Sequence, residues 1–423
     1  MRALEVAIAG AGVAGLAAAI LLTRLGHRVV VFERFAHSKP VGSGLMIQPT
    51  GLAALDVLGL RAELEGLGAR LTRLEGRTTA GASIFNVAYS DLAPDAFALG
   101  VHRAALHGVL WRAFERTGAA FEPNAPVAAI EPEPGGRIAA IADGGRKLGV
   151  FDLVLDASGA RSTLRASVDP APARSFSYGA VWANLPETGI GPGMLSQRYV
   201  AAHTMIGNLP VGRVTQDAPP LTAFFWSLKP AAYPDWRADF PRWRDTVAAL
   251  WPELGPSVQA IADPDQLTLA AYRHFTARRP FAGRLALIGD SAHATSPQLG
   301  QGANNGLLDA CALASGLAAH ADLDAALAAY ARSRRAHVRF YQLASAVMTP
   351  FFQSDSRLLA TVRDLVFDRF RLIPWLRREM VRTLAGLKTG PLASAAPEDL
   401  ASLARLRAAL PEPEGQARGS LLG

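Results

Sequence analysis

Cysteine is almost absent from this sequence: Cys311 is the only one among 423 residues. A single thiol excludes a framework of disulfide bonds within the chain and a metal site built from several cysteines. Such chains are typical of reducing compartments, so we expect a cytoplasmic protein without a metal site. Cys311 lies in a helical pattern and is expected to be a small buried apolar residue.

The sequence also lacks a long uninterrupted apolar run. Residues 1–31 are apolar enough to resemble a signal peptide or anchor, but Gly10, Gly12 and Gly15 interrupt them and basic residues close them, without a small-residue cleavage site. We therefore expect no integral membrane segment. The amphipathic segment 357–387 is better explained as helix packed across the domain, although a peripheral contact with a membrane surface stays open.

Basic residues interleaved with aromatic ones are lacking too. The formal net charge of +7 and the pI of about 9.9 would suit nucleic-acid binding, but the arginines are scattered. The densest group, Arg332, Arg334 and Arg335, falls in a helical pattern and is expected to be a solvated face. We expect no nucleic-acid partner and a mild preference for anionic small molecules. The length and the 50% hydrophobic content fit an enzyme of two or three domains.

A strand–turn–helix–strand unit opens the chain. Residues 5–9 are expected to form a buried strand, residues 12–25 a helix and residues 28–32 a second strand. The turn before the helix carries the GxGxxG pattern Gly10-Ala11-Gly12-Val13-Ala14-Gly15. The pattern alone is weak, but here it stands in the strand–turn–helix context that dinucleotide binding requires.

Each glycine of this motif has a physical role. Gly10 permits the tight turn, Gly12 lets the backbone approach a pyrophosphate, and Gly15 lets helix and strand pack closely. The free N–H groups and positive dipole end of the helix, at Val13 and Ala14, favour phosphate binding. Glu33 stands 33 − 10 = 23 residues after Gly10, close to the offset of about 20 typical of the acid that binds a ribose hydroxyl. A surface pair of Glu33 with Arg34 is the plainer alternative; we include both in the predicted cofactor site.

A second Gly-rich segment distinguishes FAD from NAD. An apolar strand at 285–288 leads to Gly289 and Asp290, and a helix is expected to begin at Gly302. An acid at a strand end can hold a polyol or ribose hydroxyl, and the start of a helix can stabilise a negatively charged ring edge. Because an NAD-only dehydrogenase needs no such distant second site, we predict FAD.

These motifs resemble those of the flavoprotein aromatic hydroxylases related to p-hydroxybenzoate hydroxylase and the ubiquinone-biosynthesis hydroxylases. The resemblance covers nearly the whole chain, and residues 289–306 are its most specific part. It implies that Asp290 binds ribityl-side or ribose hydroxyls and that Pro297 lies against the flavin ring. It also implies that the backbone at the helix start faces the flavin pyrimidine edge, at Gly300, Gly302, Ala303 and Asn304.

Two further segments match the same family. Arg103, in Val-His-Arg-Ala-Ala-Leu, matches an arginine that touches FAD, although a surface arginine at a helix start would look the same. Gly42, Gly44 and Gln48 match the loop that runs beside the flavin, which implies that Gln48 lies near the flavin ring.

One segment departs from the family pattern. Gly159, Ser162 and Arg165 align, but Ser158 replaces an aspartate that the family links to both FAD and NAD(P)H binding. The electron donor therefore stays open between NADPH, NADH and a partner reductase, with Asp156 a candidate to compensate. The variant Asp-Ala-Ser-Gly resembles flavin-dependent reductases and halogenases.

The predicted fold class is α/β, or α+β overall: a Rossmann-like FAD-binding domain, an inserted antiparallel-sheet substrate domain and C-terminal helices. The expected parts are an FAD-binding domain at 1–70, 100–174 and 276–345, a substrate-binding sheet domain at 71–99 and 175–275, C-terminal helices at 346–410, and a flexible tail at 411–423.

The resemblance implies an NAD(P)H-dependent flavoprotein monooxygenase that hydroxylates an aromatic or other electron-rich small molecule with O2 through a flavin hydroperoxide. The alternatives are a halogenase, a double-bond reductase, a monooxygenase fed by a partner reductase, and a non-catalytic redox sensor. The halogenase is disfavoured because no Trp-x-Trp-x-Ile-Pro motif occurs. No catalytic residue is expected beyond those beside the flavin, because the cofactor carries the chemistry. Tyr178, Trp182 and Phe225 are candidates for the substrate pocket, although tryptophans of 182–251 are more often core. The chain is expected to be a monomer or homodimer.

Overall fold

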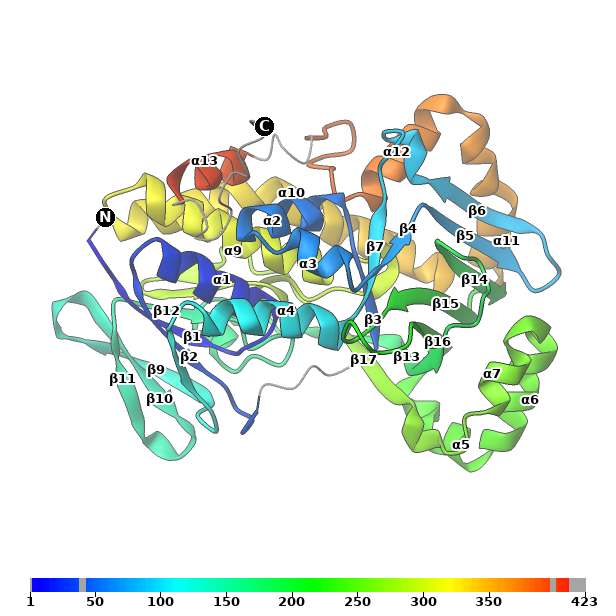
Figure 1. Ribbon diagram of the computed structural model, residues 1–423, viewed down its shortest axis with the longest axis horizontal. Helices are drawn as coiled ribbons and strands as arrows, with labels where there is room; N and C mark the ends of the chain where they lie inside the picture. Colours follow the sequence, from blue (N-terminus) through cyan, green and yellow to red (C-terminus); the bar gives the residue numbers. More distant parts are fainter. Residues whose placement is uncertain (1, 38–42, 396–400, 411–423) are drawn as a thin grey trace, which may run out of the picture.

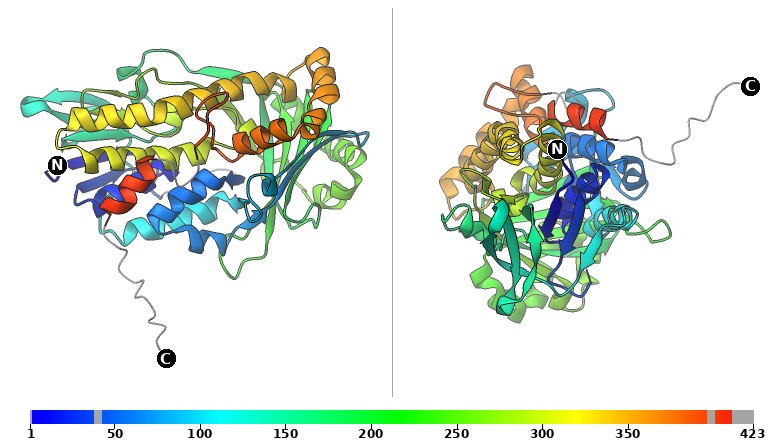
Figure 2. Two further views of the ribbon diagram at one scale, coloured as in Figure 1. Left: turned by 90° about the horizontal axis from the view of Figure 1, so that it is seen from above. Right: turned by 90° about the vertical axis from the view of Figure 1, so that its left-hand side faces the viewer.

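The computed structural model describes residues 2–37, 43–395 and 401–410, so the predicted tail at 411–423 and the predicted Gly42 lie outside it. Figure 1 shows two lobes: a layered helix-and-sheet lobe that contains the N-terminus, and a second, twisted sheet at the other end of the long axis. Two long helices run side by side along the first lobe, as the view from above in Figure 2 shows.

The first lobe is built on a six-stranded sheet in the order β18-β19-β12-β1-β2-β8. Its pairs are parallel except β18 with β19. The bounds are β1 (Glu5–Ala9), β2 (Arg28–Phe32), β8 (Ala120–Glu122), β12 (Leu153–Asp156), β18 (Phe281–Ala282) and β19 (Leu285–Leu287). The expected first unit, two strands joined by a helix, is present in parallel register.

Both faces of this sheet are covered, so its central strands are buried on both sides. One face carries α1 (Val13–Arg24), α2 (Pro49–Leu58), α3 (Arg61–Glu65), α4 (Arg103–Glu115), α9 (Gly302–Ala319) and α10 (Leu323–Phe352). The other face carries the antiparallel sheet of β9 (Val127–Glu133), β10 (Arg137–Ala142) and β11 (Lys147–Phe151). Ala7 and Phe32 pack with Phe151 on that side.

The second lobe is a seven-stranded sheet in the order β17-β13-β16-β15-β14-β5-β6. The bounds are β5 (Arg73–Thr78), β6 (Ser83–Ala88), β13 (Arg174–Pro186), β14 (Met194–Val200), β15 (Thr204–Gly212), β16 (Leu221–Leu228) and β17 (Thr268–His274). The sequence predicts an antiparallel sheet, and one pair departs from this: β5 runs parallel to β14. The two strands come from segments far apart in the chain, so no hairpin turn dictates their direction.

A small antiparallel sheet joins the lobes: β3 (Gly44–Ile47), β7 (Ala98–His102) and β4 (Ala69–Leu71), in the order β3-β7-β4. Two predicted domain boundaries, 70/71 and 99/100, fall inside β4 and β7. These strands pair across both boundaries, so the chain passes from one lobe to the other within a sheet.

The tryptophan-rich part of the second lobe is a core. Helices α5 (Tyr233–Ala238), α6 (Phe240–Leu250) and α7 (Gly255–Gln259) cover one face of the sheet. Trp226, Trp236, Trp243 and Trp251 are all buried in one cluster there. These four tryptophans therefore have a structural role in this core.

The C-terminal part differs from the expectation in two places. The predicted boundary at 345/346 falls within α10, which continues through Pro350 to Phe352. The predicted helical segment 357–387 is divided into α11 (Arg357–Val366), a 3-10 turn (Asp368–Leu372) and α12 (Pro374–Leu384), because Pro374 starts a new helix. Helix α13 (Ala401–Ala409) packs against α9 and α2. None of the helices in the described part is long and apolar enough to cross a membrane.

Candidate active site

The carboxyl ends of β1, β2 and β12 meet at one edge of the six-stranded sheet, where ligands bind in folds of this kind. Gly10 follows β1 with φ +107°, a left-handed value that favours glycine. A Cβ on Gly10 would lie 2.7 Å from the Ala157 carbonyl oxygen, and one on Gly15 would lie 2.0 Å from the Gly10 carbonyl oxygen. A Cβ on Gly12 would meet no protein atom within 4 Å. Gly12 thus faces open space, whereas Gly10 and Gly15 allow the backbone to pack closely.

Glu33, at the end of β2, faces this loop. One carboxylate oxygen accepts a hydrogen bond from the Ala11 N–H at 2.9 Å, and the other accepts one from the Phe35 N–H at 3.2 Å. The side chain of Arg34 is exposed and stacks over the Phe35 ring. The surface pair of Glu33 with Arg34, considered as an alternative, is not formed; Glu33 instead fixes the glycine loop.

Val13 and Ala14 lie in the first turn of α1, half-buried. The Ala14 side chain points at α9, because a Cβ on Gly289 or Gly306 would lie 3.1–3.2 Å from it. Ala14 therefore sets the close approach of the two helix starts, which leaves its backbone N–H as its contribution to a phosphate site.

Asp290 begins the short helix α8 (Asp290–His293) after Gly289, whose φ is +64°. Its side chain is solvent-exposed. The loss of hydration there raises the pKa of Asp290, against the opposing charges of His293 and Arg103. No described residue donates a hydrogen bond to its carboxylate, whose Oδ1 lies 3.9 Å from the Cβ position of Gly302. An acceptor with this placement is available to ligand hydroxyl groups.

Two loops meet at the start of α9, held together by Asn304. Its Oδ1 accepts a hydrogen bond from the Gln48 N–H at 2.8 Å, and its Nδ2 donates to the carbonyls of Met46 and Gly300. The Asn304 side chain is thus fully used within the protein. Asn304 was predicted to bind the cofactor, and the structure gives its side chain a positioning role.

Gln48 is fully buried beside these loops. Its Oε1 accepts a hydrogen bond from the Tyr89 hydroxyl at 2.5 Å, whereas its Nε2 has no partner within the described residues. That Nε2 lies 3.5 Å from the Cβ position of Gly300, which has φ +61°. Pro297 is half-buried in the 3-10 turn (Pro297–Leu299) just before it, and Ala303 is half-buried in the first turn of α9. An unpaired buried donor next to a glycine turn is an available contact for the polar edge of a ring.

Gly44 has a role that the sequence did not indicate. A Cβ at this position would lie 2.4 Å from Val211 and 2.7 Å from Ala223, both in the second sheet. The glycine is therefore required where the loop packs against the substrate lobe. Its neighbour Ser43 accepts the Arg103 N–H through its carbonyl, which places the start of α4 at the same loop.

These features fit FAD. A pyrophosphate would take the N–H groups at Gly12–Val13, a ribose hydroxyl would lie by Glu33, and ribityl hydroxyls would lie by Asp290. The isoalloxazine edge would meet Gln48 Nε2 and the N-terminus of α9. The charge of Arg103 acts to lower the pKa values of both Asp290 and Tyr272, against the effect of burial.

The Ser158 segment is a compact turn around Asp156. Ser158 donates from its hydroxyl (2.5 Å) and its N–H (3.0 Å) to one oxygen of Asp156, and the Ser162 hydroxyl donates to the other. Burial raises the pKa of Asp156, while these hydrogen bonds and Arg165 act in the opposite direction. The serine that replaces the family aspartate thus binds the upstream aspartate, and Asp156 points into the turn.

Two of the three predicted substrate residues meet. The rings of Trp182 on β13 and Phe225 on β16 lie 4.6 Å apart, centroid to centroid. The Trp182 indole N–H donates to the Tyr272 hydroxyl at 3.1 Å, and burial raises the pKa of Tyr272 to about 12. Tyr272, on β17, was missed because β17 has no sequence motif. Tyr178 lies apart from this pair: its hydroxyl donates to Asp355 at 2.7 Å.

A buried network of charged residues lies behind the Asp290 loop, and no sequence pattern predicts it. Asp309 accepts hydrogen bonds from the Gly289 N–H (2.8 Å) and from Arg334 (2.7 Å), and it bonds His293 at 2.5 Å. Burial alone would raise the pKa of Asp309, but His293 and Arg334 lower it to about 2. Arg334, expected to be solvated, is buried because of this pair. His293 therefore has a structural role: it holds Asp309.

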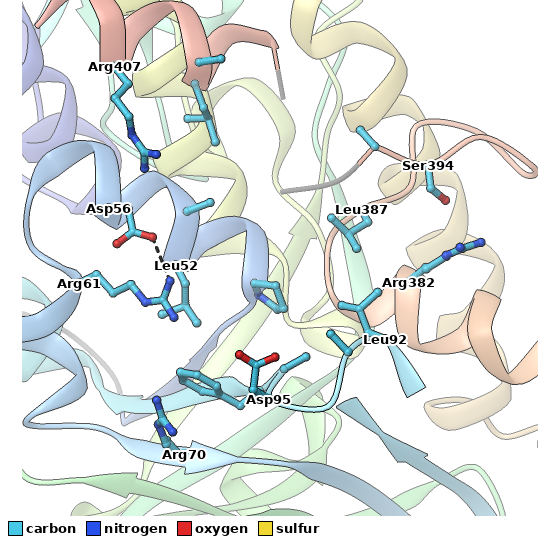
Figure 3. A pocket seen from close by; sticks show the side chains of 18 of the residues that line it. Leu52, Asp56, Arg61, Arg70, Leu92, Asp95, Arg382, Leu387, Ser394 and Arg407 are labelled. Atoms are coloured by element: carbon cyan, nitrogen blue, oxygen red, sulfur yellow. Dashed lines mark hydrogen bonds and ion pairs between the residues drawn. The ribbon is translucent and has the colours of Figure 1, made fainter. Parts of the chain in front are cut away.

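A cavity of about 1230 Å³ lies elsewhere in the described part of the chain. Figure 3 shows it between α2, the loop at 92–97 and the C-terminal segments, with Arg61, Asp95 and Arg407 around it. It is lined by none of the residues predicted for FAD or substrate. The volume of a cavity therefore does not by itself identify the predicted FAD and substrate site. No cluster of three or more potential metal ligands occurs within residues 2–37, 43–395 and 401–410.

Comparison with known proteins agrees with this geometry. Residues 3–342 match the family described as FAD binding domain. The 3-amino-4-hydroxybenzoate 2-monooxygenase of Streptomyces cremeus is 29% identical over 331 residues, 74% of this chain and 78% of that protein. The FAD-dependent urate hydroxylase of Mycolicibacterium vanbaalenii is 29% identical over 346 residues, 79% of this chain and 85% of that protein.

Solved structures share the fold. Klebsiella pneumoniae HpxO, crystallised with FAD and uric acid, has a TM-score of 0.75 at 22% identity, covering 92% of this chain and 98% of that one. The tetrameric form of 2-methyl-3-hydroxypyridine-5-carboxylic acid oxygenase has a TM-score of 0.72 at 22% identity, covering 86% and 98%.

The family match extends over most of the chain, and this chain belongs to the FAD-binding-domain family of flavoprotein hydroxylases and monooxygenases. It is an oxidoreductase whose cofactor is FAD, and its relatives hydroxylate aromatic molecules.

Proposed function

We propose that this chain hydroxylates a small electron-rich aromatic molecule, using O2 and two electrons from NADPH or NADH. One oxygen atom enters the substrate and the other leaves as water. The observation that carries the proposal is that the loop at Ser43 and Gly44 contacts β13, β15 and β16 of the second sheet. Trp182 and Phe225 lie on two of these strands, and together with Tyr272 on β17 they form the aromatic wall. Bound FAD would supply the redox chemistry, namely the uptake of two electrons from the nicotinamide and the activation of O2.

The residues of the chain would bind and orient. Trp182 and Phe225 offer flat apolar surfaces for an aromatic ring, and Tyr272 fixes the Trp182 indole. Arg103 and the dipole of α9 would stabilise negative charge on the reduced flavin edge or on an anionic substrate. No described side chain in this wall is a general base, which suits a substrate that is already electron-rich.

The electron donor is proposed to be a freely diffusing nicotinamide nucleotide. Ser158 occupies the aspartate position of the family, but Asp156 is held in the same turn and Arg165 lies over Phe275 beside it, 4.4 Å from the ring. Arg165 is buried beside this turn, whereas Arg161 within the turn is exposed, and its positive charge suits an anionic nucleotide at this edge of the sheet.

We also propose a cellular compartment, an oligomeric state and a choice of binding partners for this protein. The chain is proposed to act in the cytoplasm as a monomer or homodimer and to bind no nucleic acid. The scattered arginines and the single, buried Cys311 support this.

Oxygen labelling tests the function. The FAD-loaded protein would be given NADPH or NADH, ¹⁸O2 and, in turn, hydroxybenzoates, aminohydroxybenzoates and heteroaromatic acids, with products read by mass spectrometry. We expect one compound class to accelerate nucleotide oxidation and to gain one labelled oxygen. Nucleotide oxidation that yields only hydrogen peroxide with every compound, or a product labelled from water, would contradict the proposal.

A further inference from the structure

Helix α11 is turned so that its apolar side faces outward. Leu358, Val362, Leu365 and Val366 follow each other at helical spacing and are all exposed; Leu358 is 73% and Leu365 55% exposed. Residues four and seven apart lie on one face of a helix. These four side chains therefore form a continuous apolar stripe on the surface.

The opposite side of α11 carries a buried arginine. Arg363 is fully buried, donates to the Phe351 carbonyl at 3.1 Å, and lies over the rings of Tyr199 and Phe352. Arg363 thus anchors the helix to the second lobe, while Leu358 and Leu365 lie in water. This is the reverse of the usual arrangement, in which the apolar stripe faces the core. An exposed apolar stripe of this kind indicates a contact partner.

The apolar surface continues beyond α11. Leu372 is 66% exposed and Trp375 54%, with Ile373 between them, and the 3-10 turn before them packs on α11 through Phe367 and Phe370. We call the C-terminal apolar patch the set Leu358, Val362, Leu365, Val366, Leu372, Ile373 and Trp375. Figures 1 and 2 place α11 and α12 together at the end of the molecule that holds the seven-stranded sheet.

Positive charge surrounds this patch. Arg357, Arg369 and Arg378 are exposed and form no ion pair with any described residue, and Arg369 gives one hydrogen bond to the Leu365 carbonyl. The two acids of this stretch are engaged: Asp364 accepts from Arg363, and Asp368 accepts from the Ser83 hydroxyl. The patch is therefore apolar at its centre and cationic at its rim.

We propose that the C-terminal apolar patch binds the surface of an anionic lipid bilayer. Leucine, tryptophan and arginine at one surface are the composition that favours the interface between lipid headgroups and acyl chains. A second copy of the chain suits the patch less well. A two-fold interface would bring the patch onto itself, so that its arginine rim would face arginines.

Vesicle co-sedimentation of the FAD-loaded protein tests this proposal. The probes are vesicles of phosphatidylcholine alone and vesicles of equal parts phosphatidylcholine and phosphatidylglycerol. We expect binding to the anionic vesicles, a partition coefficient at least ~10-fold lower for Leu358→Glu/Leu365→Glu, and loss of the anionic preference for Arg357→Glu/Arg378→Glu. Vesicles with brominated acyl chains should quench wild-type fluorescence more than that of Trp375→Phe.

Matched controls separate the patch from any exposed apolar residue. Leu392→Glu changes a side chain that is 82% exposed elsewhere on the surface, and this variant should bind like wild type. FAD content and the thermal unfolding midpoint should be unchanged in every variant; Leu358→Gln/Leu365→Gln replaces the double Glu variant if it loses FAD. No binding of wild type to either vesicle would overturn the proposal. So would a wild-type dimer in light scattering that Leu358→Glu/Leu365→Glu dissociates.

Discussion

The cofactor side and the substrate side of the candidate active site differ in what faces the ligand: mainly backbone on the cofactor side and side chains on the substrate side. On the cofactor side, backbone groups and glycines face the ligand space, and strand ends fix their positions. Gly10 and Gly15 are required by the close packing of this turn. On the substrate side, the surface consists of side chains on β13, β16 and β17, such as Trp182 and Tyr272, which could be exchanged without moving the sheet. Changes on the first side should therefore remove FAD, and changes on the second should alter substrate binding alone.

The largest effect is expected for Gly15→Ala. The added Cβ would lie 2.0 Å from the Gly10 carbonyl oxygen, with backbone on both sides. We expect a loss of about 3 kcal/mol in the free energy of unfolding, together with protein purified without flavin. Gly12→Ala is the matched control: its Cβ meets no protein atom, so urea unfolding of the apoprotein should be unchanged while the Kd for FAD rises about 10-fold. Normal flavin content in Gly15→Ala would break the comparison.

Asp309→Asn should come next, because it leaves Arg334 buried without a counter-charge. We expect a loss of about 3 kcal/mol at neutral pH. The pKa of Asp309 is lowered from 3.8 to about 2 on folding, so its contribution is present above pH 4 and is lost as the pH falls toward 2. The shift corresponds to about 2 kcal/mol. Denaturant unfolding of both proteins from neutral pH downward measures this; a constant difference across that range would contradict the assignment.

Asp290→Asn should act on FAD alone. The carboxylate accepts no hydrogen bond from the described residues, and desolvation raises its pKa, so folding does not favour its charge. We expect the Kd for FAD to rise about 10-fold or more, the effect of one charge-assisted hydrogen bond. The apoprotein should be no less stable than wild type. Fluorescence titration with FAD and urea unfolding are the two measurements, and an apoprotein that unfolds more easily would assign Asp290 a structural role.

The smallest effect is expected on the substrate side. Tyr272→Phe removes the acceptor of the Trp182 indole N–H, a hydrogen bond worth about 1 kcal/mol. We expect the KM for the aromatic substrate to rise about fivefold, with the Kd for FAD unchanged. Tyr178→Phe is the control, because that hydroxyl binds Asp355 away from the wall. Equal effects of the two variants would show that the substrate lies elsewhere.

The sequence predicted the cofactor side well because its constraints are local. The first strand, turn and helix form within residues 5–24, and backbone sterics select their glycines. Two roles were still hidden. Gly44 is required by Val211 and Ala223 of the other lobe, and the Asn304 side chain ties two loops, and both depend on contacts between distant segments.

The substrate side was less predictable for the same reason. Tyr272 joins Trp182 through pairing of β13 with β17, some ninety residues apart, and no motif marks that pairing. Asp309 and Arg334 lie in helices whose patterns show a buried and a solvated face, so only the packing of α9 on α10 reveals the ion pair. The alternation of polar and apolar residues also does not reveal strand direction, so the sequence did not predict the parallel pairing of β5 with β14.

The central claim is that NAD(P)H delivers electrons to FAD held at this sheet edge, for use on an aromatic substrate. The most direct test is the rate of anaerobic flavin reduction by NADPH and by NADH, with and without a set of phenolic and heteroaromatic acids. The account predicts reduction by at least one nucleotide, at a rate that rises when one compound class is added. Absence of reduction by either nucleotide with every compound would contradict it and would mean that Ser158 marks an enzyme with another source of electrons.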